Sequence, residues 1–342
     1  MYSRVCLLCI IVILSIGHVV CKAGVRKNAE KFCMNFDIIY PLDDKCERMS
    51  NQSESEVDLF GIVDKTQLEN IHNGSKNCKG HTKYVVDKKE KYKPFKIEYG
   101  EGDVEGKEIT KDVKITDKFT VEKQLFGAAS KVGLKSTGLD DVMGLDLYML
   151  DGHPSVFNNM IKQELIKDPI LGVLVTEEQL KKGGELMFGG TDEWEYIEDT
   201  GVKAKMHTGG LTTTTMTSLT FDKVTYCGEE KKACNVVVDL GCSDIYGPKE
   251  FVDAVNKIIV PEGDVVDCDL RDSTPAIEIK FGEQTITLEA EYYIKQIRTT
   301  CYTTIFIDEE EIDWQFGLPF FVKYYIAFDF TDKEEAICFF EK

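Results

Sequence analysis

The stretch that decides the fold of this chain is Val236-Val237-Val238-Asp239-Leu240-Gly241-Cys242-Ser243-Asp244-Ile245-Tyr246-Gly247-Pro248. Three β-branched residues lead into an aspartate, and a glycine and a Gly-Pro pair follow, which predicts a buried strand that ends in a tight turn. Aspartate is depleted in strands and is seldom buried without a partner. Asp239 is therefore either a cap of the turn and of the helix after it, or a carboxylate with a chemical role.

The length and composition of the chain are those of a globular protein. Its 342 residues are enough for one large bilobal unit or two domains, and 43% of them are hydrophobic. The formal charge of −19 results from 41 basic and 60 acidic residues, and it argues against a phosphate-binding surface. We therefore expect no nucleic acid partner.

The N-terminus has the pattern of a secretory signal peptide. Arg4 precedes an apolar run at residues 5–16 that is short for a membrane span, and small residues near Cys21 and Ala23 offer a cleavage site. An uncleaved membrane anchor is the alternative. We assign residues 1–23 to the signal peptide, and we expect the mature protein to leave the membrane and to be secreted or to reside in the endomembrane lumen.

The cysteine content predicts disulfides. Nine of the twelve cysteines remain after removal of the signal segment, so at least one is unpaired or pairs between chains. Cys227 and Cys234 flank a short predicted hairpin and are expected to bond, whereas spacing leaves open the partners of Cys33, Cys46, Cys78, Cys242 and Cys338. Asn51 and Asn73 begin N-glycosylation sequons. No CxxC pair or histidine cluster supports a metal site, and we expect no metal and no cofactor.

Two parts of the chain repeat one layout. Val63-Asp64 repeats the strand-to-aspartate transition of Val238-Asp239, and each is followed much later by an apolar residue and a glycine, in Val142-Met143-Gly144 and in Gln315-Phe316-Gly317. Asp64 and Gly144 are 80 positions apart (144 − 64), and Asp239 and Gly317 are 78 apart (317 − 239). This near-equal spacing predicts a duplicated β lobe, in which each lobe contributes one carboxylate.

Local patterns predict mostly strands between these landmarks. Alternation around Tyr99-Gly100-Glu101-Gly102 predicts a β-hairpin, and helical spacing predicts short helices at 156–165 and 250–259. The glycine pairs of 183–190 lack a phosphate-loop pattern and are interpreted as turns around a short strand. We interpret Thr212–Thr215 as a polar loop. Further strands are predicted at 113–126, 171–175, 217–226, 277–281, 285–288 and 292–297.

Together these motifs resemble the pepsin-like aspartic proteases over nearly all of the predicted mature chain. The second catalytic motif of that family, with its following Gly-Pro, resembles Val237-Val238-Asp239-Leu240-Gly241-Cys242-Ser243 and Gly247-Pro248, and its flap motif resembles Tyr99-Gly100-Glu101-Gly102. The remaining similar segments are Asp141-Val142-Met143-Gly144-Leu145, Leu186-Met187-Phe188-Gly189-Gly190-Thr191-Asp192 and Tyr324-Tyr325-Ile326-Ala327-Phe328-Asp329.

The resemblance implies an all-β, bilobal pepsin-like fold with a few short helices and an interlobe cleft. It implies an N-terminal lobe at 24–192, a C-terminal lobe at 193–342 and a disulfide between Cys268 and Cys301. A peptide or protein would bind in the cleft, and we expect a monomer. The catalytic carboxylates would be Asp64 and Asp239, and the substrate-binding residues would be Tyr99, Gly100, Gly102, Gly241 and Ser243.

The chain departs from the family at both catalytic motifs, which read Asp64-Lys65-Thr66 and Asp239-Leu240-Gly241 where the family has Asp-Thr-Gly. Acid proteolysis needs two carboxylates that share one proton. The Lys65 ammonium would favour two ionised carboxylates, Thr66 places a β-branched side chain where backbones approach, and Leu240 has no polar side-chain atom. The favoured hypothesis is a secreted homologue that is inactive or weakly active and binds a peptide or protein in the cleft.

Two other functions remain open from the sequence: an active acid endopeptidase that uses Asp64 and Asp239, and a secreted structural or interaction protein whose cleft has no function. Tyr99 either places its hydroxyl near the site or is an ordinary hairpin aromatic. Cys242 is either a reactive thiol or inert packing, and we favour packing because no histidine lies nearby in the sequence. The resemblance begins near Phe32, which leaves no room for an inhibitory propeptide.

Overall fold

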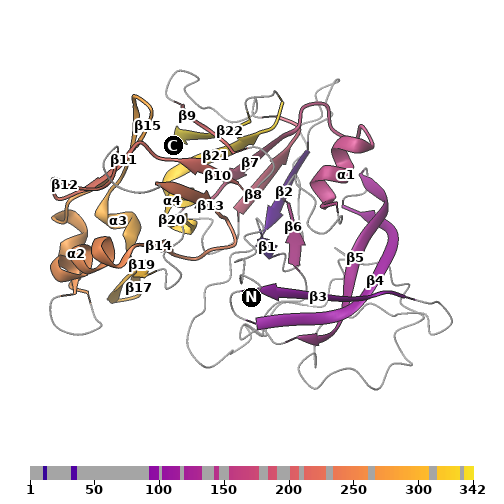
Figure 1. The fold of residues 1–342 in the computed structure, drawn as a ribbon, viewed down its shortest axis with the longest axis horizontal. Helices are drawn as coiled ribbons and strands as arrows, with labels where there is room; N and C mark the ends of the chain where they lie inside the picture. The colour runs from indigo at the N-terminus through magenta and orange to yellow at the C-terminus, as the bar shows by residue number, and fades with distance from the viewer. Residues whose placement is uncertain are drawn as a thin grey trace. The chain divides into compact units, whose positions relative to one another are not determined.

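The chain folds into two compact units that consist mainly of β-strands (Figure 1). This computed structural model describes residues 11–13, 32–36, 92–99, 102–115, 119–132, 142–145, 154–176, 184–190, 201–207, 212–228, 234–260, 266–307, 314–331 and 335–342. The predicted all-β class with a few short helices is confirmed.

The first unit comprises residues 1–24 and 36–165. Its main sheet has three antiparallel strands in the order β3-β4-β5, and α1 packs on β5. The predicted hairpin is present, because Tyr99 at the end of β3 pairs with Gly102 at the start of β4. The elements of this unit are β1 (Ile11–Ile13), β3 (Pro94–Tyr99), β4 (Gly102–Lys114), β5 (Thr120–Val132), β6 (Val142–Gly144) and α1 (Val156–Lys162).

Helix α1 confirms the helix predicted from residue 156 onward and is joined to β5 by a buried polar contact. Ser155 caps the helix by accepting a hydrogen bond from the Asn158 backbone N–H. Asn159 Nδ2 donates to Gln124 Oε1 at 2.8 Å, and the Gln124 amide in turn donates to the Pro154 carbonyl at 2.9 Å. Both amide side chains are buried, so these bonds offset the cost of removing them from water.

Strand β6, the apolar-glycine segment of the first half, pairs with β1. The pairing is antiparallel, with Ile11 opposite Gly144 and Ile13 opposite Val142. Strand β1 lies within the predicted signal peptide, and its cleavage would remove this strand. Cleavage of residues 1–23 stays a prediction.

The second unit comprises residues 25–35 and 166–342 and contains sheets of six, five, four and two strands. The six-stranded sheet has the order β2-β8-β7-β21-β22-β9. Its strands are β2 (Phe32–Phe36), β7 (Ile170–Leu174), β8 (Gly184–Phe188), β9 (Val202–Lys205), β21 (Tyr324–Asp329) and β22 (Ala336–Glu341).

This six-stranded sheet explains where the compact units divide. Strand β7 pairs with both β8 and β21, so residues 166–190 lie with the C-terminal strands. The lobe boundary at 192/193, which the sequence resemblance implies, stays a prediction. Local patterns could not show the pairing of β7 with β21, because the two strands are more than 150 residues apart. Gly189 and Gly190 have φ of 91° and 144°, in keeping with a turn after β8.

The remaining sheets hold most of the C-terminal half. The five-stranded sheet has the order β10-β13-β20-β14-β19, the four-stranded sheet β12-β11-β15-β16, and β17 pairs with β18. Their strands are β10 (Thr213–Thr215), β11 (Ser218–Phe221), β12 (Val224–Cys227), β13 (Asn235–Val238), β14 (Ile245–Gly247), β15 (Ile277–Phe281), β16 (Gln284–Leu288), β17 (Ile294–Ile297), β18 (Thr300–Thr303), β19 (Ile305–Ile307) and β20 (Trp314–Phe316).

The helices of the second unit are short. Helix α2 buries one apolar face, and its Phe251 ring lies 4.9 Å from the Trp314 ring, centroid to centroid. This helix confirms the amphipathic segment predicted after Gly247-Pro248. The helices are α2 (Lys249–Ile259), the 3₁₀ helix η5 (Cys268–Asp272), α3 (Ala290–Tyr293) and α4 (Leu318–Lys323). None of the helices in the described ranges is long and apolar enough to span a membrane.

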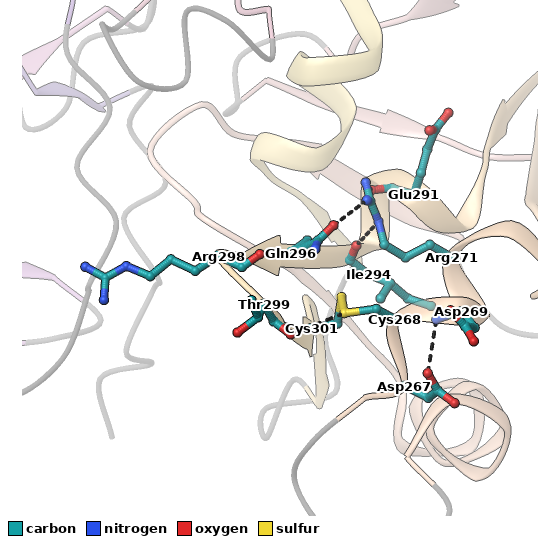
Figure 2. Close-up of a disulfide and its surroundings, with 10 residues drawn as sticks. All are labelled: Asp267, Cys268, Asp269, Arg271, Glu291, Ile294, Gln296, Arg298, Thr299 and Cys301. Carbon is teal, nitrogen blue, oxygen red and sulfur yellow. Dashed lines mark hydrogen bonds between the residues drawn. A yellow bond between two sulfur atoms is a disulfide. The ribbon is translucent and has the colours of Figure 1, made fainter.

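Both expected disulfides are present. Cys227–Cys234 closes the segment between β12 and β13, and Cys268–Cys301 joins η5 to β18 (Figure 2). In the same region, the Arg271 guanidinium donates to the carbonyls of Ile294 and Glu291 at 3.1 and 3.2 Å. These bonds and the disulfide fix η5 against β17 and β18. Cys242 and Cys338, which also lie in the described part of the chain, take part in neither disulfide.

Two local predictions were wrong. Residues 212–215 are not a polar loop, because Thr213–Thr215 form β10 and Thr212 and Thr214 are buried. Residues 292–297 are not strand throughout, because α3 extends to Tyr293 and β17 begins at Ile294. The threonine run forms a strand because β-branched residues favour strands and β10 pairs with β13.

Candidate functional site

The site is built around the turn that follows β13. In β13, Val236 and Val238 are fully buried and Val237 nearly so, as expected for a strand inside a sheet. Strand β13 runs parallel to β20, with Val238 opposite Phe316. The Asp239 backbone N–H then donates to the Phe316 carbonyl at 3.0 Å, which continues the strand pairing to the aspartate itself.

The Asp239 side chain is 5% exposed and has a donor on each carboxylate oxygen. The Gly241 backbone N–H donates to Oδ1 at 2.8 Å, and the Gln315 side-chain amide donates to Oδ2 at 3.2 Å. The first bond is a local one within the turn. The second joins residues that are 76 positions apart in the sequence. The carboxylate is thus held from its own turn and from the adjacent strand β20.

Thr212 supports the same strand from its other side, and sequence reasoning missed it. The Val238 N–H donates to the Thr212 carbonyl at 3.0 Å, and the Thr212 hydroxyl donates to the Val238 carbonyl at 2.8 Å. Thr212 is 2% exposed, so its hydroxyl replaces water at the residue directly before Asp239. A run of four threonines carries no local signal for this role, because the contact depends on how β10 pairs with β13.

Gly317 allows two backbone segments to meet beside the turn. A Cβ atom at Gly317 would lie 2.4 Å from the Cys242 carbonyl oxygen and 2.3 Å from the Asp244 carbonyl oxygen. The next residue, Leu318, donates its backbone N–H to the Cys242 carbonyl at 2.8 Å. Glycine is therefore required here by space, and α4 begins from this contact.

The residues between Asp239 and Asp244 differ in exposure. Leu240 and Cys242 are buried, Gly241 is exposed, and Ser243 is half-buried. The Cys242 thiol donates to the Asp244 carbonyl at 3.2 Å, so it takes part in the packing of the turn. The Ser243 hydroxyl donates to the Asp244 carboxylate.

Asp244 and Lys295 are two half-buried groups of opposite charge near the site. Burial raises the pKa of Asp244, and the hydrogen bond from Ser243 and the positive charge of Lys295 offset part of this rise. Burial lowers the pKa of Lys295 to about 8, and the negative charge of Asp244 acts in the opposite direction. Each of the two groups therefore favours the ionised form of the other.

A row of residues crosses the five-stranded sheet beside Asp239. Val237, Gln315, Tyr246 and Phe306 are register partners on β13, β20, β14 and β19. The Tyr246 and Phe306 rings lie 5.9 Å apart, and Phe306 is 41% exposed. Because register partners share one face of a sheet, this row places an amide and two aromatic rings on the face opposite Trp314 and Phe316.

The predicted residues of the first half are described only in part. Tyr99 and Gly102 flank the hairpin turn at the ends of β3 and β4. The structure gives no description of Asp64, Lys65, Thr66, Gly100, Cys46, Cys78 or the sequon residues Asn51 and Asn73, and the assignments made for them stay predictions. Within the described part of the chain, no group of three or more His, Cys, Asp or Glu residues is placed to hold a metal ion.

Comparison with known proteins identifies the family. Residues 55–338 match the family model described as eukaryotic aspartyl protease. The chain belongs to this family. The aspartyl protease resemblance and the all-β pepsin-like fold inferred from the sequence are confirmed.

Several curated aspartyl proteases are similar to this chain. Cathepsin D of Clupea harengus is 28% identical over 310 residues, which cover 80% of this chain and 76% of that protein. Cathepsin D of Rattus norvegicus is 28% identical, with 79% and 74% covered. Pregnancy-associated glycoprotein 1 of Bos taurus is 25% identical, with 69% and 64% covered. Within such an aspartyl protease, the buried carboxylate at the end of β13 is the residue to which the resemblance assigns catalysis.

Proposed function

We propose that this aspartyl protease homologue is a secreted peptide-binding protein whose acid endopeptidase activity is lost or strongly reduced. The peptide binds at the face of the second unit that carries Asp239. The observation that carries the proposal is the environment of Leu240, a buried apolar residue directly after the carboxylate. This position holds a hydroxyl in the family motif, and Leu240 offers neither a donor nor an acceptor there.

The first motif supports the same conclusion from the sequence. In Asp64-Lys65-Thr66 an ammonium follows the aspartate, and a threonine stands where the family has glycine. A positive charge beside two carboxylates favours their fully ionised state, whereas the reaction needs one proton between them. Groups that act as one catalytic unit lose their effect together, so a defect at either motif is enough to remove most of the rate.

A second candidate function, an active acid endopeptidase, is favoured by the preserved geometry around Asp239. The carboxylate is buried, and its turn donates the Gly241 N–H to Oδ1 at 2.8 Å. A carboxylate fixed in this way has the orientation that acid-base catalysis needs. This candidate uses Asp64 as the second carboxylate.

An assay of acid proteolysis separates the two functions. The purified mature chain is incubated with an unfolded protein between about pH 3 and 6, where one carboxylate of a pair can hold a proton. We expect no turnover above that of the Asp239→Ala variant. Turnover that is abolished both in Asp239→Ala and by a statine-type transition-state mimic would establish the endopeptidase instead.

Binding is measured separately from cleavage. We expect the wild-type chain to bind a fluorescent statine-containing peptide, and we expect Asp239→Ala to weaken this binding at least about tenfold through loss of a charge-assisted hydrogen bond. Asp253→Ala is the matched control, because Asp253 lies on the exposed face of α2 in an ion pair with Lys249. Equal binding by wild type and Asp239→Ala would contradict a peptide site at this face.

A further inference from the structure

Gln315 occupies a position in β20 where a polar residue is unexpected. Its neighbours Trp314 and Phe316 are 2% and 1% exposed and point into the core. Alternation along a strand directs Gln315 to the opposite face, where its register partners are Val237 and Tyr246. The amide is a polar exception between two buried aromatic residues, and it makes a specific contact.

That contact is the hydrogen bond from Gln315 Nε2 to Asp239 Oδ2, at 3.2 Å. An N–H donor on a carboxylate oxygen stabilises the ionised form and is lost or must turn away when that oxygen takes a proton. Oδ1 already accepts the Gly241 N–H, which is fixed by the backbone of the turn. Of these two donors, the side chain of Gln315 is the adjustable one, and it acts on Oδ2.

We propose that Gln315 is a positioning residue for Asp239, whose side-chain amide orients the carboxylate through Oδ2 and keeps it ionised within the second unit. This inference rests on the proposed function in one respect, since it takes Asp239 as the carboxylate of the peptide-binding site. It adds that a side chain on β20, as well as the two family motifs, determines whether the Asp239 carboxylate is ionised. A carboxylate held ionised binds N–H groups of a peptide and is a poor partner in a shared-proton pair.

Other titratable groups on the surrounding elements could also act on Asp239. Cys242 and Asp244 follow it on the same turn, Tyr246 lies on β14, and Lys295 on β17 interacts with Asp244. Each of these groups is retained in the variants below. A change in the titration of Asp239 that accompanies substitution of Gln315 alone is therefore assigned to the amide.

The test is a direct titration of the Asp239 carboxyl group. The full chain is labelled with ¹³Cγ-aspartate, the Asp239 resonance is assigned by its loss in Asp239→Asn, and its shift is followed between about pH 2.5 and 8 in wild type and in Gln315→Leu. We expect the midpoint to move upward by about one pH unit in Gln315→Leu, because a donor to the charged form is removed.

Gln315→Glu keeps the shape of the side chain and brings a second carboxyl group within reach. We expect a still larger upward shift there, with two coupled steps.

Gln296→Leu is the control, because Gln296 also uses its amide in hydrogen bonds, to Arg298 and Arg271, but lies on β17 away from Asp239. Its Asp239 titration is expected to coincide with that of wild type. If the Asp239 carboxyl group titrates in Gln315→Glu as it does in wild type, the proposal is overturned and Gln315 has only a packing role. This outcome can be measured even if Gln315→Leu does not fold. The titration needs no peptidase activity, so it can contradict the role of Gln315 without contradicting the proposed function. The proteolysis and binding assays test the proposed function separately.

Discussion

The two apolar-glycine segments of the chain, β6 with Gly144 and β20 with Gly317, have similar sequences and different surroundings. A Cβ atom on Gly144 would meet no atom within 4 Å in the described part of the protein, whereas one on Gly317 would overlap two carbonyl oxygens of the Asp239 turn. Strand β6 pairs with β1, and β20 lies between β13 and β14. Within the described residues, close backbone contact at such a glycine is seen at Gly317, where β13 and β14 enclose β20.

Replacing each glycine by alanine tests this difference most directly. We expect Gly317→Ala to lower the free energy of unfolding by about 3 kcal/mol or more, because the new methyl group overlaps backbone atoms that cannot rotate away. Gly144→Ala is the matched control and should change it by no more than about 0.5 kcal/mol. Urea unfolding of both variants measures the effects, and similar losses in the two variants would show that the glycines have equivalent surroundings.

An ion pair between Lys323 and Glu289 lies at the C-terminal end of α4, the helix that starts after Gly317. Removing this ion pair tests whether that end of the helix is held independently of Gly317. Lys323 Nζ lies 2.6 Å from Glu289 Oε2, and the side chains are 9% and 47% exposed. Burial alone would raise the pKa of Glu289 and lower that of Lys323. Their mutual hydrogen bond and charge outweigh burial, so the pKa of Glu289 is lowered and that of Lys323 is raised. The pair therefore stabilises the fold while both groups are charged.

We expect Lys323→Met to cost about 2 kcal/mol at pH 7, less than for a fully buried pair because half of Glu289 is exposed to solvent. A lowered pKa means that the folded protein binds the Glu289 proton more weakly than the unfolded chain does. The stabilisation is thus present above the ordinary pKa of glutamate and is lost as the pH falls through the lowered value. The difference between wild type and variant in urea unfolding should therefore shrink from pH 7 to pH 3.

Lys249→Met removes an exposed ion pair with Asp253 in α2 and is the control, with an expected change within about 0.5 kcal/mol. A loss in Lys323→Met that is the same at pH 7 and pH 3 would mean that the charge of Glu289 does not hold the end of α4, and that the hydrogen bonds from Lys323 to Thr287 and the packing of the lysine chain do.

The smallest expected effect concerns the side of β13 that faces away from Gly317. Thr212→Val removes the hydroxyl that donates to the Val238 carbonyl at 2.8 Å, and we expect a loss of about 1 kcal/mol in the free energy of unfolding. Thr285→Val, an exposed position of β16, is the control with no expected loss. If Thr212→Val is as stable as its control, the Thr212 hydroxyl adds no net stability, and the backbone bond from Val238 to the Thr212 carbonyl supports this side of β13.

Much of the fold could be predicted from the sequence, because its signals are local. The Tyr99-Gly102 hairpin, α1, α2 and the strand that delivers Asp239 each follow from spacing within about a dozen residues. Motif order along the chain indicated the aspartyl protease family before any contact was known. The Cys227–Cys234 disulfide followed from the hairpin between them, and Cys268–Cys301 from the family resemblance.

The details of the candidate site could not be predicted in the same way. From the sequence, Gln315 is only part of the segment that ends at Gly317 and Thr212 is part of a polar run, yet both contact the Asp239 segment. Their roles depend on the parallel register of β13 with β20 and on the pairing of β10 with β13. Register between distant strands is set by the packing of whole sheets, and no local pattern encodes it.

The sequence by itself therefore determined that Asp239 ends a buried strand at a glycine turn, and that the residue beside it, Leu240, lacks a polar atom. Tertiary structure alone decided that Gln315 reaches its carboxylate and that Gly317 must be glycine. The physical reason is distance along the chain. A strand, a turn and a missing hydroxyl are properties of neighbouring residues, whereas a hydrogen bond across 76 positions exists only after the sheet has formed.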